Sequence, residues 1–247
     1  ITSTMQRAAS SKLGFGVSKT MQVAQKLYEG IEINGAPVGL ITYMRTDSVR
    51  VSDDAQNMAH DYILQNYGEQ YYPKETNIYA KGKQNVQDAH EAIRPSYPDR
   101  TPESIKKYLD NDQYKLYKLI WDKFMSSQMA PAEIANKSIE IESGEYTLKA
   151  GTSKVVFDGF LTLYNDDEEE NSQDADAKIP DLNKGDKVNC KKVEPKQHFT
   201  QPPARFTEAS LVKKLEELGI GRPSTYATIM STIVDRKYVE QDKQHRF

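Results

Sequence analysis

The spacing of apolar residues changes twice along this chain, and that change limits the folds it can adopt. Up to about residue 130, apolar residues recur three and four positions apart, as Met5, Ala9 and Leu13 do, which is typical of one face of a helix. After Pro131 they alternate with polar residues, as in strands, and beyond Pro203 the helical spacing returns. The pattern predicts an α+β fold, mainly α, with a strand-rich region between two helical regions.

Capping residues place the ends of several predicted helices. Gly14 and Gly30 are predicted to end helices, and Ser18, Ser52 and Pro102 are predicted to begin them. These positions divide the first half of the chain into short helices joined by tight turns.

Turn residues also organise the predicted strands. Asn34-Gly35 predicts a tight turn between two short extended runs. Ser143-Gly144 predicts the turn of a hairpin that continues through 155–157 and 160–164. The alternation of Val188, Cys190 and Val193 predicts a later strand.

Charge is distributed unevenly along the chain. The net charge of −3 argues weakly against nucleic acid as a partner. However, seven acidic residues lie within 166–176. The rest of the chain contains 29 acidic residues and 33 lysines and arginines, so it is mildly basic. We interpret 165–178 as a solvated loop, and we expect any nucleic-acid binding to depend on a local groove.

Several classes of site are excluded by what the sequence lacks. Cys190 is the single cysteine, which excludes an internal disulfide and a multi-cysteine zinc site in this chain and favours a reducing, cytoplasmic setting. No run of eighteen apolar residues occurs, so no membrane span is predicted. The sequence also contains no Walker-type phosphate loop.

Tyr43 has the most distinctive neighbours among the fifteen tyrosines. Arg45 and Asp47 follow it at two-residue steps, so in an extended segment all three side chains point to one side. A phenol is a poor nucleophile near neutral pH unless its proton is accepted or its oxyanion is stabilised. A guanidinium can stabilise that oxyanion and clamp a phosphate. The spacing makes Tyr43 a candidate nucleophile, and simple packing is the alternative for any single tyrosine.

A second cluster runs from Asp88 to Pro95 and includes His90 and Arg94. A histidine and an arginine this close could place a proton shuttle and a cation at one phosphate. The alternative is a solvated charge pair at the end of a surface helix, which is the better explanation of His90 taken alone.

A third cluster runs from Gly219 to Tyr226. A helix beginning near Pro223 would offer free backbone N–H groups to a phosphate, with Arg222 and the Ser224 and Thr225 hydroxyls beside them. Capping of the helix explains the same residues, and both roles can hold together. With the helix before it and a possible wing over 238–247, this region resembles a helix-turn-helix unit.

In this order, the three clusters resemble the type IA DNA topoisomerases, and among them bacterial topoisomerase I. The resemblance covers nearly the whole chain and is weakest over 165–178. Its most specific part is Gln25-x-Leu27-Tyr28-Glu29 followed by Thr42-Tyr43-x-Arg45-Thr46-Asp47. The residue after Tyr43 is Met44, which resembles topoisomerase I; in topoisomerase III a proline is usual at this position.

The resemblance implies a role for each cluster. Tyr43 would attack a DNA phosphodiester and become joined to the 5′-phosphate, while Arg45 stabilises charge on the phosphate. Asp47 and His90 would assist cleavage and religation by hydrogen bonding. The residues expected to contact DNA are Arg94, Arg222, Ser224 and Thr225.

The resemblance also implies an architecture, which in the family is a toroid of four lobes. This chain would hold the helical tyrosine-bearing lobe (1–131), the second half of the β-rich arch (132–198) and part of a helical, winged-helix-like DNA-binding lobe (199–247). The Toprim lobe, which binds Mg²⁺ in the family, would be absent. No metal site is therefore expected in this chain, and the fragment alone is expected to be inactive.

The implied function is ATP-independent, magnesium-dependent relaxation of negatively supercoiled DNA through a transient 5′-phosphotyrosine. The expected partners are single-stranded and negatively supercoiled DNA, and a cytoplasmic, nucleoid-associated monomer is expected. One alternative is a non-catalytic DNA-binding module built on 207–235. The other is a sister type IA enzyme, either topoisomerase III or reverse gyrase.

Overall fold

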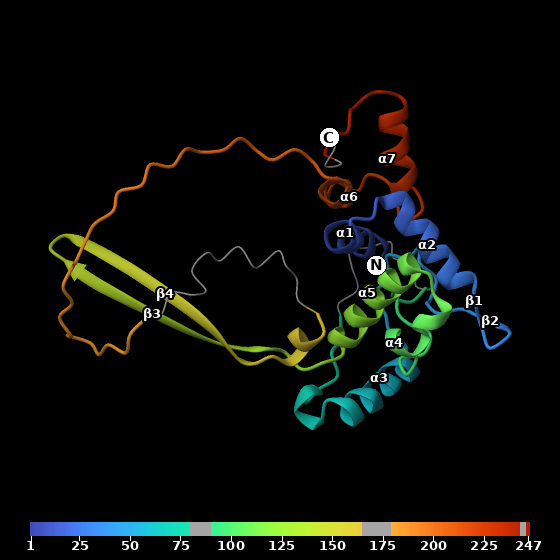
Figure 1. Cartoon of the computed structure of the whole chain (residues 1–247), viewed down its shortest axis with the longest axis horizontal. Coiled ribbons are helices and arrows are strands. Elements are labelled where there is room, and N and C mark those ends of the chain that lie inside the picture. The colour runs from blue at the N-terminus through green and yellow to red at the C-terminus, as the bar shows by residue number, and fades with distance from the viewer. Residues whose placement is uncertain (80–89, 165–178, 243–245) are drawn as a thin grey trace. The chain divides into compact units, whose positions relative to one another are not determined.

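The computed structural model describes residues 1–79, 90–164, 179–242 and 246–247, and the chain divides into two compact units (Figure 1). The helical unit comprises Ile1–Pro131, Gly159–Tyr164 and Arg205–Phe247. The hairpin unit comprises Ala132–Asp158 and Asn165–Ala204. The predicted mixture of helices and strands is confirmed. No helix in the described parts of the chain is both long and apolar enough to cross a membrane.

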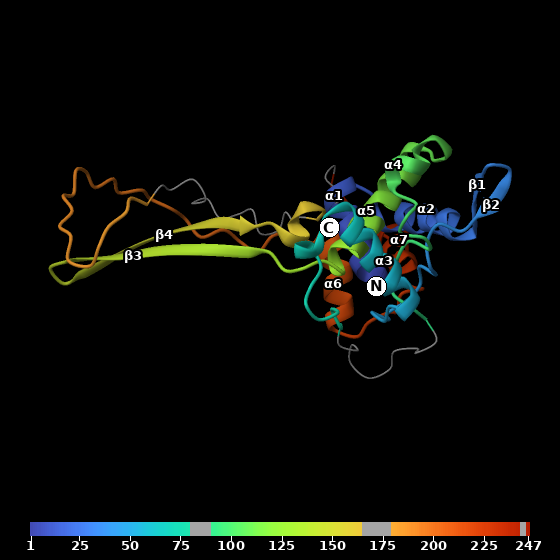
Figure 2. The same cartoon turned by 90° about the horizontal axis from the view of Figure 1, so that it is seen from below.

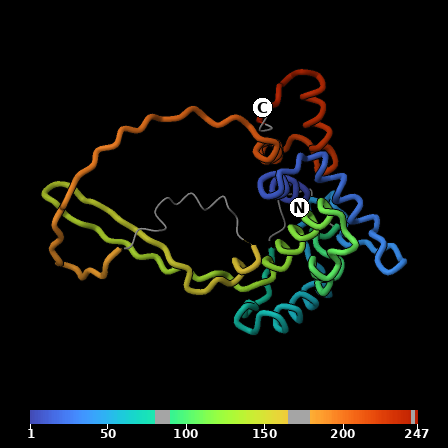
Figure 3. The backbone as a smooth tube through the Cα atoms, viewed as in Figure 1, coloured from blue at the N-terminus to red at the C-terminus, as the bar shows by residue number. Residues whose placement is uncertain are grey.

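The main core of the helical unit lies among four helices, which Figure 3 traces from blue to green. They are α1 (Thr2–Leu13), α2 (Val17–Glu29), α3 (Asp53–Asn66) and α5 (Asn111–Ser127). Their apolar faces meet as the helical spacing predicts, and fully buried side chains such as Leu27, Met44 and Leu116 fill the space between them. This packing gives the loops between the helices fixed positions.

Most predicted helix ends are confirmed. Gly14 ends α1 in the left-handed conformation, with φ 66°, and Gly30 follows the last residue of α2. The Ser52 hydroxyl accepts a hydrogen bond from the Ala55 N–H at the start of α3. The predicted start at Ser18 is wrong, because α2 already begins at Val17, after Gly16, and no side chain of its own first turn caps it.

Short elements connect these helices. Strands β1 (Ile31–Ile33) and β2 (Ala36–Val38) form a small hairpin. Its predicted turn is confirmed, since Asn34 and Gly35 both have positive φ, at 53° and 82°. The other short elements are η1 (Glu69–Tyr71), α4 (Pro102–Ile105), with Pro102 in the predicted first turn, and η2 (Lys106–Tyr108).

Two further helices, α6 (Glu208–Glu217) and α7 (Tyr226–Asp235), pack on α1 and α2 (Figure 1). They bury a small second core formed by Val17 of α2 with Val212, Tyr226 and Met230. The predicted helix pair is therefore confirmed. It belongs to the same compact unit as residues 1–131.

The hairpin unit is built on β3 (Glu133–Ser143) and β4 (Tyr146–Phe157), the long twisted ribbon in Figure 2. They pair antiparallel, and Ser143 lies opposite Tyr146 across the predicted turn. No described residue of this unit is buried. Its regular structure rests on backbone pairing and cross-strand contacts, without a core.

Two strand predictions are wrong. Residues 160–164 do not extend the hairpin, because Gly159 turns the chain into η3 (Gly159–Thr162) and Tyr164 packs into the main core. Residues 188–193 form no strand, and the side chains of Val188 and Val193 are exposed. Alternation alone does not produce a strand where no neighbouring strand pairs with it.

Some predictions fall on residues that the structure does not describe. Residues 88 and 89 of the second cluster, the acidic segment 165–178 and residues 243–245 of the possible wing lie outside the described ranges. The division at 131 and 198 into three functional domains stays a prediction.

Candidate functional site

The segment 43–47 is held in place by the first residue of α1. The Thr2 backbone N–H donates to the Thr46 carbonyl oxygen over 2.9 Å, and the Thr2 hydroxyl accepts from the Thr46 N–H over 2.9 Å. The same hydroxyl donates to the Met44 carbonyl oxygen over 2.7 Å. These bonds are buried, so the backbone path beside Tyr43 is fixed.

Side chains alternate along this segment. Met44, Thr46 and Ser48 are buried, whereas Tyr43, Arg45 and Asp47 reach the surface. The last three line one cavity, as their two-residue spacing predicts. Packing residues on one side thus present a phenol, a guanidinium and a carboxylate on the other.

His90 reaches Tyr43 because the chain after it pairs with the chain before Tyr43. The Thr42 N–H donates to the Arg94 carbonyl oxygen, and the Ser96 N–H donates to the Leu40 carbonyl oxygen, both over 2.9 Å. The Thr42 hydroxyl adds a bond to the Ala92 carbonyl oxygen. As a result, the His90 and Tyr43 ring centroids lie 5.2 Å apart.

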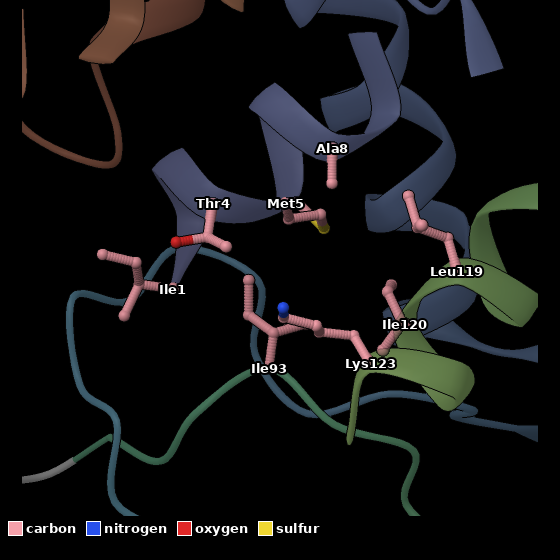
Figure 4. Close-up of a pocket in the computed structure, with 8 residues that line it drawn as sticks. All are labelled: Ile1, Thr4, Met5, Ala8, Ile93, Leu119, Ile120 and Lys123. Atoms are coloured by element: carbon pink, nitrogen blue, oxygen red, sulfur yellow. The ribbon is translucent and has the colours of Figure 1, made fainter. Parts of the chain in front are cut away.

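Ile93 anchors the same segment to the helices. Figure 4 shows its side chain in a hollow between α1 and α5, facing residues that include Met5, Ile120 and Lys123. The hollow has a volume of about 50 Å³ and is lined mainly by apolar side chains. It is too small for a substrate, so we interpret it as packing that holds the His90 segment.

A larger cavity of about 480 Å³ unites the first and third clusters with His90. The residues that line it are Tyr43, Arg45, Asp47, His90, Arg222, Pro223 and Ser224. Two guanidiniums beside a phenol and an imidazole suit a phosphodiester, because arginine binds phosphate oxygens in a fixed fork geometry. The arrangement can bind a phosphate, stabilise charge on it and place a nucleophile next to it.

Arg94 does not line this cavity. Its guanidinium pairs with the Glu91 carboxylate over 2.7 Å and donates to the Pro95 carbonyl oxygen, and its side chain is 11% exposed. These contacts give Arg94 a structural role in the segment after His90. Its contact with DNA stays a prediction that the cavity does not support.

The third cluster differs from its predicted form at one point. Helix α7 begins at Tyr226 and not near Pro223, because residues 222–225 first form a turn. In that turn the Thr225 hydroxyl accepts from the Arg222 N–H over 2.8 Å, and the Thr225 N–H donates to the Arg222 carbonyl oxygen. Thr225 thus stabilises the turn, while Arg222 and Ser224 face the cavity.

A second tyrosine, Tyr226, follows the turn that lines the cavity but is a poorer candidate for the nucleophile than Tyr43. Burial raises the pKa of Tyr226, and the carboxylates of Glu216 and Asp47 add to the rise while Arg222 opposes it. Tyr226 therefore holds its proton more firmly than an ordinary tyrosine does. Its phenol is a poorer nucleophile than one whose oxyanion is stabilised.

Sequence reasoning missed two contributors to the site. Tyr28, near the end of α2, is 40% exposed and packs edge-on against Tyr43 with ring centroids 5.4 Å apart. Thr2, which holds the segment, was not singled out. Tyr28 had a signal, since it belongs to the motif Gln25-x-Leu27-Tyr28-Glu29 that precedes the candidate nucleophile. The contact of Thr2 across more than forty residues had none.

The donor set of the cavity does not suit a magnesium ion. Among the described residues that line it, Asp47 is the single carboxylate, and Mg²⁺ requires several oxygen ligands. No group of three His, Cys, Asp or Glu side chains able to hold a metal occurs in the ranges that the structure describes. No step of the chemistry below is therefore assigned to a metal held by this chain.

Comparisons with known proteins agree on one family. A family profile described as DNA topoisomerase matches residues 1–247. DNA topoisomerase 1 of Rickettsia felis is 48% identical over 246 residues, which cover 99% of this chain and 32% of that protein. The structure of full-length topoisomerase I from Thermotoga maritima superimposes with a TM-score of 0.78 at 39% identity, over 99% of this chain and 39% of that one. The chain thus spans 32% of the one relative and 39% of the other.

Proposed function

Because the chain belongs to the DNA topoisomerase family, as a bacterial type IA member, we propose that its protein relaxes negatively supercoiled DNA without ATP by transient cleavage of one strand. The observation that carries this proposal is the convergence of Tyr43, Arg45, Asp47 and His90 on one cavity with Arg222 and Ser224. Both relatives carry the name topoisomerase I, which favours this branch over topoisomerase III and reverse gyrase.

In this proposal Tyr43 Oη attacks a backbone phosphorus in single-stranded DNA. The new O–P bond forms as the bond from phosphorus to the 3′-oxygen breaks, which leaves a 5′-phosphotyrosine and a free 3′-hydroxyl. The phenolic proton leaves Tyr43, and a proton is delivered to the 3′-oxygen. Because the covalent link conserves the energy of the phosphodiester, religation is the reverse attack by the 3′-hydroxyl and needs no nucleotide.

The neighbours of Tyr43 have distinct roles in this step. Arg45 stabilises negative charge on the phosphate and on the phenolate, a preorganised electrostatic role. The His90 ring lies tilted against the Tyr43 ring, with centroids 5.2 Å apart, and can exchange a proton or donate a hydrogen bond at the phosphate. Asp47 orients the groups around the cavity by accepting hydrogen bonds.

The DNA strand is proposed to enter along the start of α7. Arg222 and Ser224 line the cavity and would hold backbone phosphates on the path to Tyr43. Thr225 supports the turn that presents them. These contacts are to the backbone, so they position the strand without reading its bases.

The rest of the proposal concerns the whole protein. We assign 1–131 to the tyrosine-bearing lobe, 132–198 to the β-rich arch and 199–247 to the DNA-binding lobe of the family's toroid. Magnesium would be held by a Toprim lobe outside these 247 residues, where it would neutralise phosphate charge. A monomer in the cytoplasm, acting on the nucleoid, fits a DNA substrate.

The decisive experiment uses a chimera in which this chain replaces the matching third of Rickettsia felis DNA topoisomerase 1. Tyr43→Phe removes the nucleophilic oxygen and keeps the ring that packs between Tyr28 and His90. We expect covalent adducts with single-stranded oligonucleotides to vanish while oligonucleotide affinity changes by less than about threefold, since one hydroxyl contact is lost.

The matched control is Tyr226→Phe, which removes a phenol that does not line the cavity and should leave adduct formation intact. Adducts that survive Tyr43→Phe would overturn the assignment of the nucleophile. Full relaxation by an Arg45→Ala chimera would instead favour a DNA-binding module without this chemistry.

A further inference from the structure

Glu208, the first residue of α6, reaches the start of α2. The Val17 N–H donates to Glu208 Oε2 over 2.6 Å, across 191 residues of sequence. The first turn of α2 has no side-chain cap of its own, because its N-cap residue is Gly16. A carboxylate satisfies a free N–H at this position and interacts favourably with the positive end of the helix dipole. Glu208 therefore caps a helix to which it does not belong.

The Glu208 carboxylate is half-buried and has a second partner. Gln241 Nε2 donates to its Oε1 over 3.1 Å. A Cβ atom added at Gly16 would lie 3.3 Å and 3.7 Å from its two oxygens. Gly16 has φ −63° and ψ 158°, values that any residue can adopt. The glycine thus leaves room for the carboxylate, which would have to shift by a few tenths of an ångström to admit a Cβ, and the backbone conformation does not require a glycine.

Apolar and polar contacts continue this attachment. Val17 is fully buried in the second core with Val212, Tyr226 and Met230. The Ser3 hydroxyl of α1 donates to Glu216 Oε1 over 2.8 Å at the other end of α6. The pair α6–α7, which carries Arg222 in its connecting turn, is therefore seated on the beginning of α2.

The opposite end of α2 supports the nucleophile. Tyr28 packs against Tyr43, and the Leu27 carbonyl oxygen accepts from the Leu40 N–H over 2.8 Å. Thirteen residues of helix separate the two ends, about 20 Å at 1.5 Å per residue. One rigid helix thus holds the segment with Tyr43 at its end and the segment with Arg222 at its beginning.

We propose that Glu208 is a positioning residue, which sets the placement of Arg222 and Ser224 relative to Tyr43 through α2. This inference rests on the proposed function. Glu208 does not line the cavity, so its effect on the reaction would pass through the seating of α6–α7. Its loss should widen the range of positions that Arg222 adopts, while the main core stays folded.

The geometric half of the inference is tested in the chain itself. Spin labels at Lys26→Cys on α2 and Lys213→Cys on α6 occupy exposed positions, after Cys190→Ser removes the exposed native thiol. We expect one narrow distance distribution with Glu208 and a clearly broader one with Glu208→Ala. An unchanged distribution would overturn the proposal whatever the chemistry of the protein.

The catalytic half is tested in the chimera with a single-stranded oligonucleotide at saturating concentration. Glu208→Ala should lower the rate constant of adduct formation by about 10- to 100-fold, because a misplacement of about 1 Å can have this effect. The oligonucleotide Kd should change by less than about threefold. A purely structural loss would reduce the amount of adduct and leave the rate constant of the folded fraction unchanged.

Two further variants and a control sharpen the test. Glu208→Gln retains an acceptor for the Val17 N–H and should restore most of the rate. Gly16→Ala should also slow the reaction, because its Cβ would displace the Glu208 carboxylate. In the double variant with Glu208→Ala it should cause little further loss of rate. Glu217→Gln, at an exposed position of the same helix, should have no effect.

The outcomes separate this inference from the function on which it rests. A chimera with the native Glu208 that forms no adduct overturns the proposed function, and with it the catalytic half; the distance measurement still decides the geometric half. Normal adduct formation that is unaffected by Glu208→Ala and by Gly16→Ala overturns the positioning role and leaves the proposed function standing.

Discussion

The two units of this chain achieve regular structure by different means. The helical unit surrounds a core of fully buried side chains such as Leu27 and Met125, whereas no described residue of the hairpin unit is buried. In the hairpin, Leu148 and Val156 are more than half exposed, and strand pairing supplies the order. An isolated two-stranded hairpin is marginally stable in water at best.

This difference determines where chemistry can be placed. A catalytic constellation needs side chains held within a fraction of an ångström by packing behind them. Among the described residues, buried side chains occur in the helical unit alone, and the described residues that line the candidate cavity belong to it. The hairpin unit is suited to spanning distance, and substitutions should reveal the contrast.

The largest expected effect comes from equal truncations in the two units. Leu27→Ala should lower the free energy of unfolding by about 2–5 kcal/mol, because it leaves a cavity in a close-packed core. Leu148→Ala, at a 56% exposed position, should change it by less than about 0.5 kcal/mol. Trp121, the single tryptophan and a buried residue of α5, reports unfolding by its fluorescence in denaturant. Equal effects of the two substitutions would remove the contrast.

Glycines give a smaller but more local contrast. Gly159 has φ 47°, and an added Cβ would lie 2.6 Å from the Ala130 and Pro131 carbonyl oxygens. Gly159→Ala should therefore lower stability by about 2–4 kcal/mol, from left-handed strain and overpacking together. Gly151→Ala in β4 is the control, since its Cβ would meet only the Lys137 carbonyl oxygen at 3.8 Å. Thermal unfolding would contradict this expectation if Gly151→Ala proved the more harmful change.

The smallest effect is a difference in titration between two aspartates. Burial raises the pKa of Asp122 in α5, although Lys118 opposes the rise, whereas the Lys137 ammonium lowers the pKa of Asp181 in the hairpin unit. The stabilisation linked to protonated Asp122 is present below its unfolded pKa and is lost as pH rises through its folded pKa. For Asp181 it is present above the unfolded pKa and is lost as pH falls through the folded pKa.

Carboxyl chemical shifts followed by NMR across acidic pH test this ordering. Asp122 should titrate at a higher pH than Asp181. Asp122→Asn should remove the transition at the higher pH and leave the other in place. Added salt should bring Asp181 toward its ordinary pKa, because its contact with Lys137 is exposed to solvent. If Asp181 titrated at a higher pH than Asp122, burial in the helical unit would not be what sets the order of the two pKa values.

Local sequence signals predicted the elements of the helical unit well. The ends at Gly14 and Gly30 and the start at Ser52 follow from short-range chemistry that a sequence displays directly. The two strand errors occurred where an alternating pattern was overridden by packing or had no partner strand. Tyr164 alternates like a strand residue but is drawn into the main core, and Val188 alternates without a neighbouring strand to pair with it.

The candidate site was predictable to a similar depth. The two-residue spacing of Tyr43, Arg45 and Asp47 indicated a shared face, and the structure places all three on one cavity. The contact from Glu208 to Val17 could not be predicted, because it joins residues 191 positions apart and depends on how two helix pairs pack. Periodicity and capping carry no information on such pairings.

The alternation along residues 43–48 assigns two different tasks to neighbouring positions: the outward residues line the cavity, and the buried residues hold the segment. Under the proposed function, substitutions at the outward positions Arg45 and Asp47 should change reactivity with little effect on packing, whereas those at Met44 and Thr46 should disturb the packing and hydrogen bonds that hold the segment. Evolution, or a protein engineer, can therefore alter the chemistry of this surface one position at a time on an unchanged scaffold. Each trial then incurs little risk of misfolding.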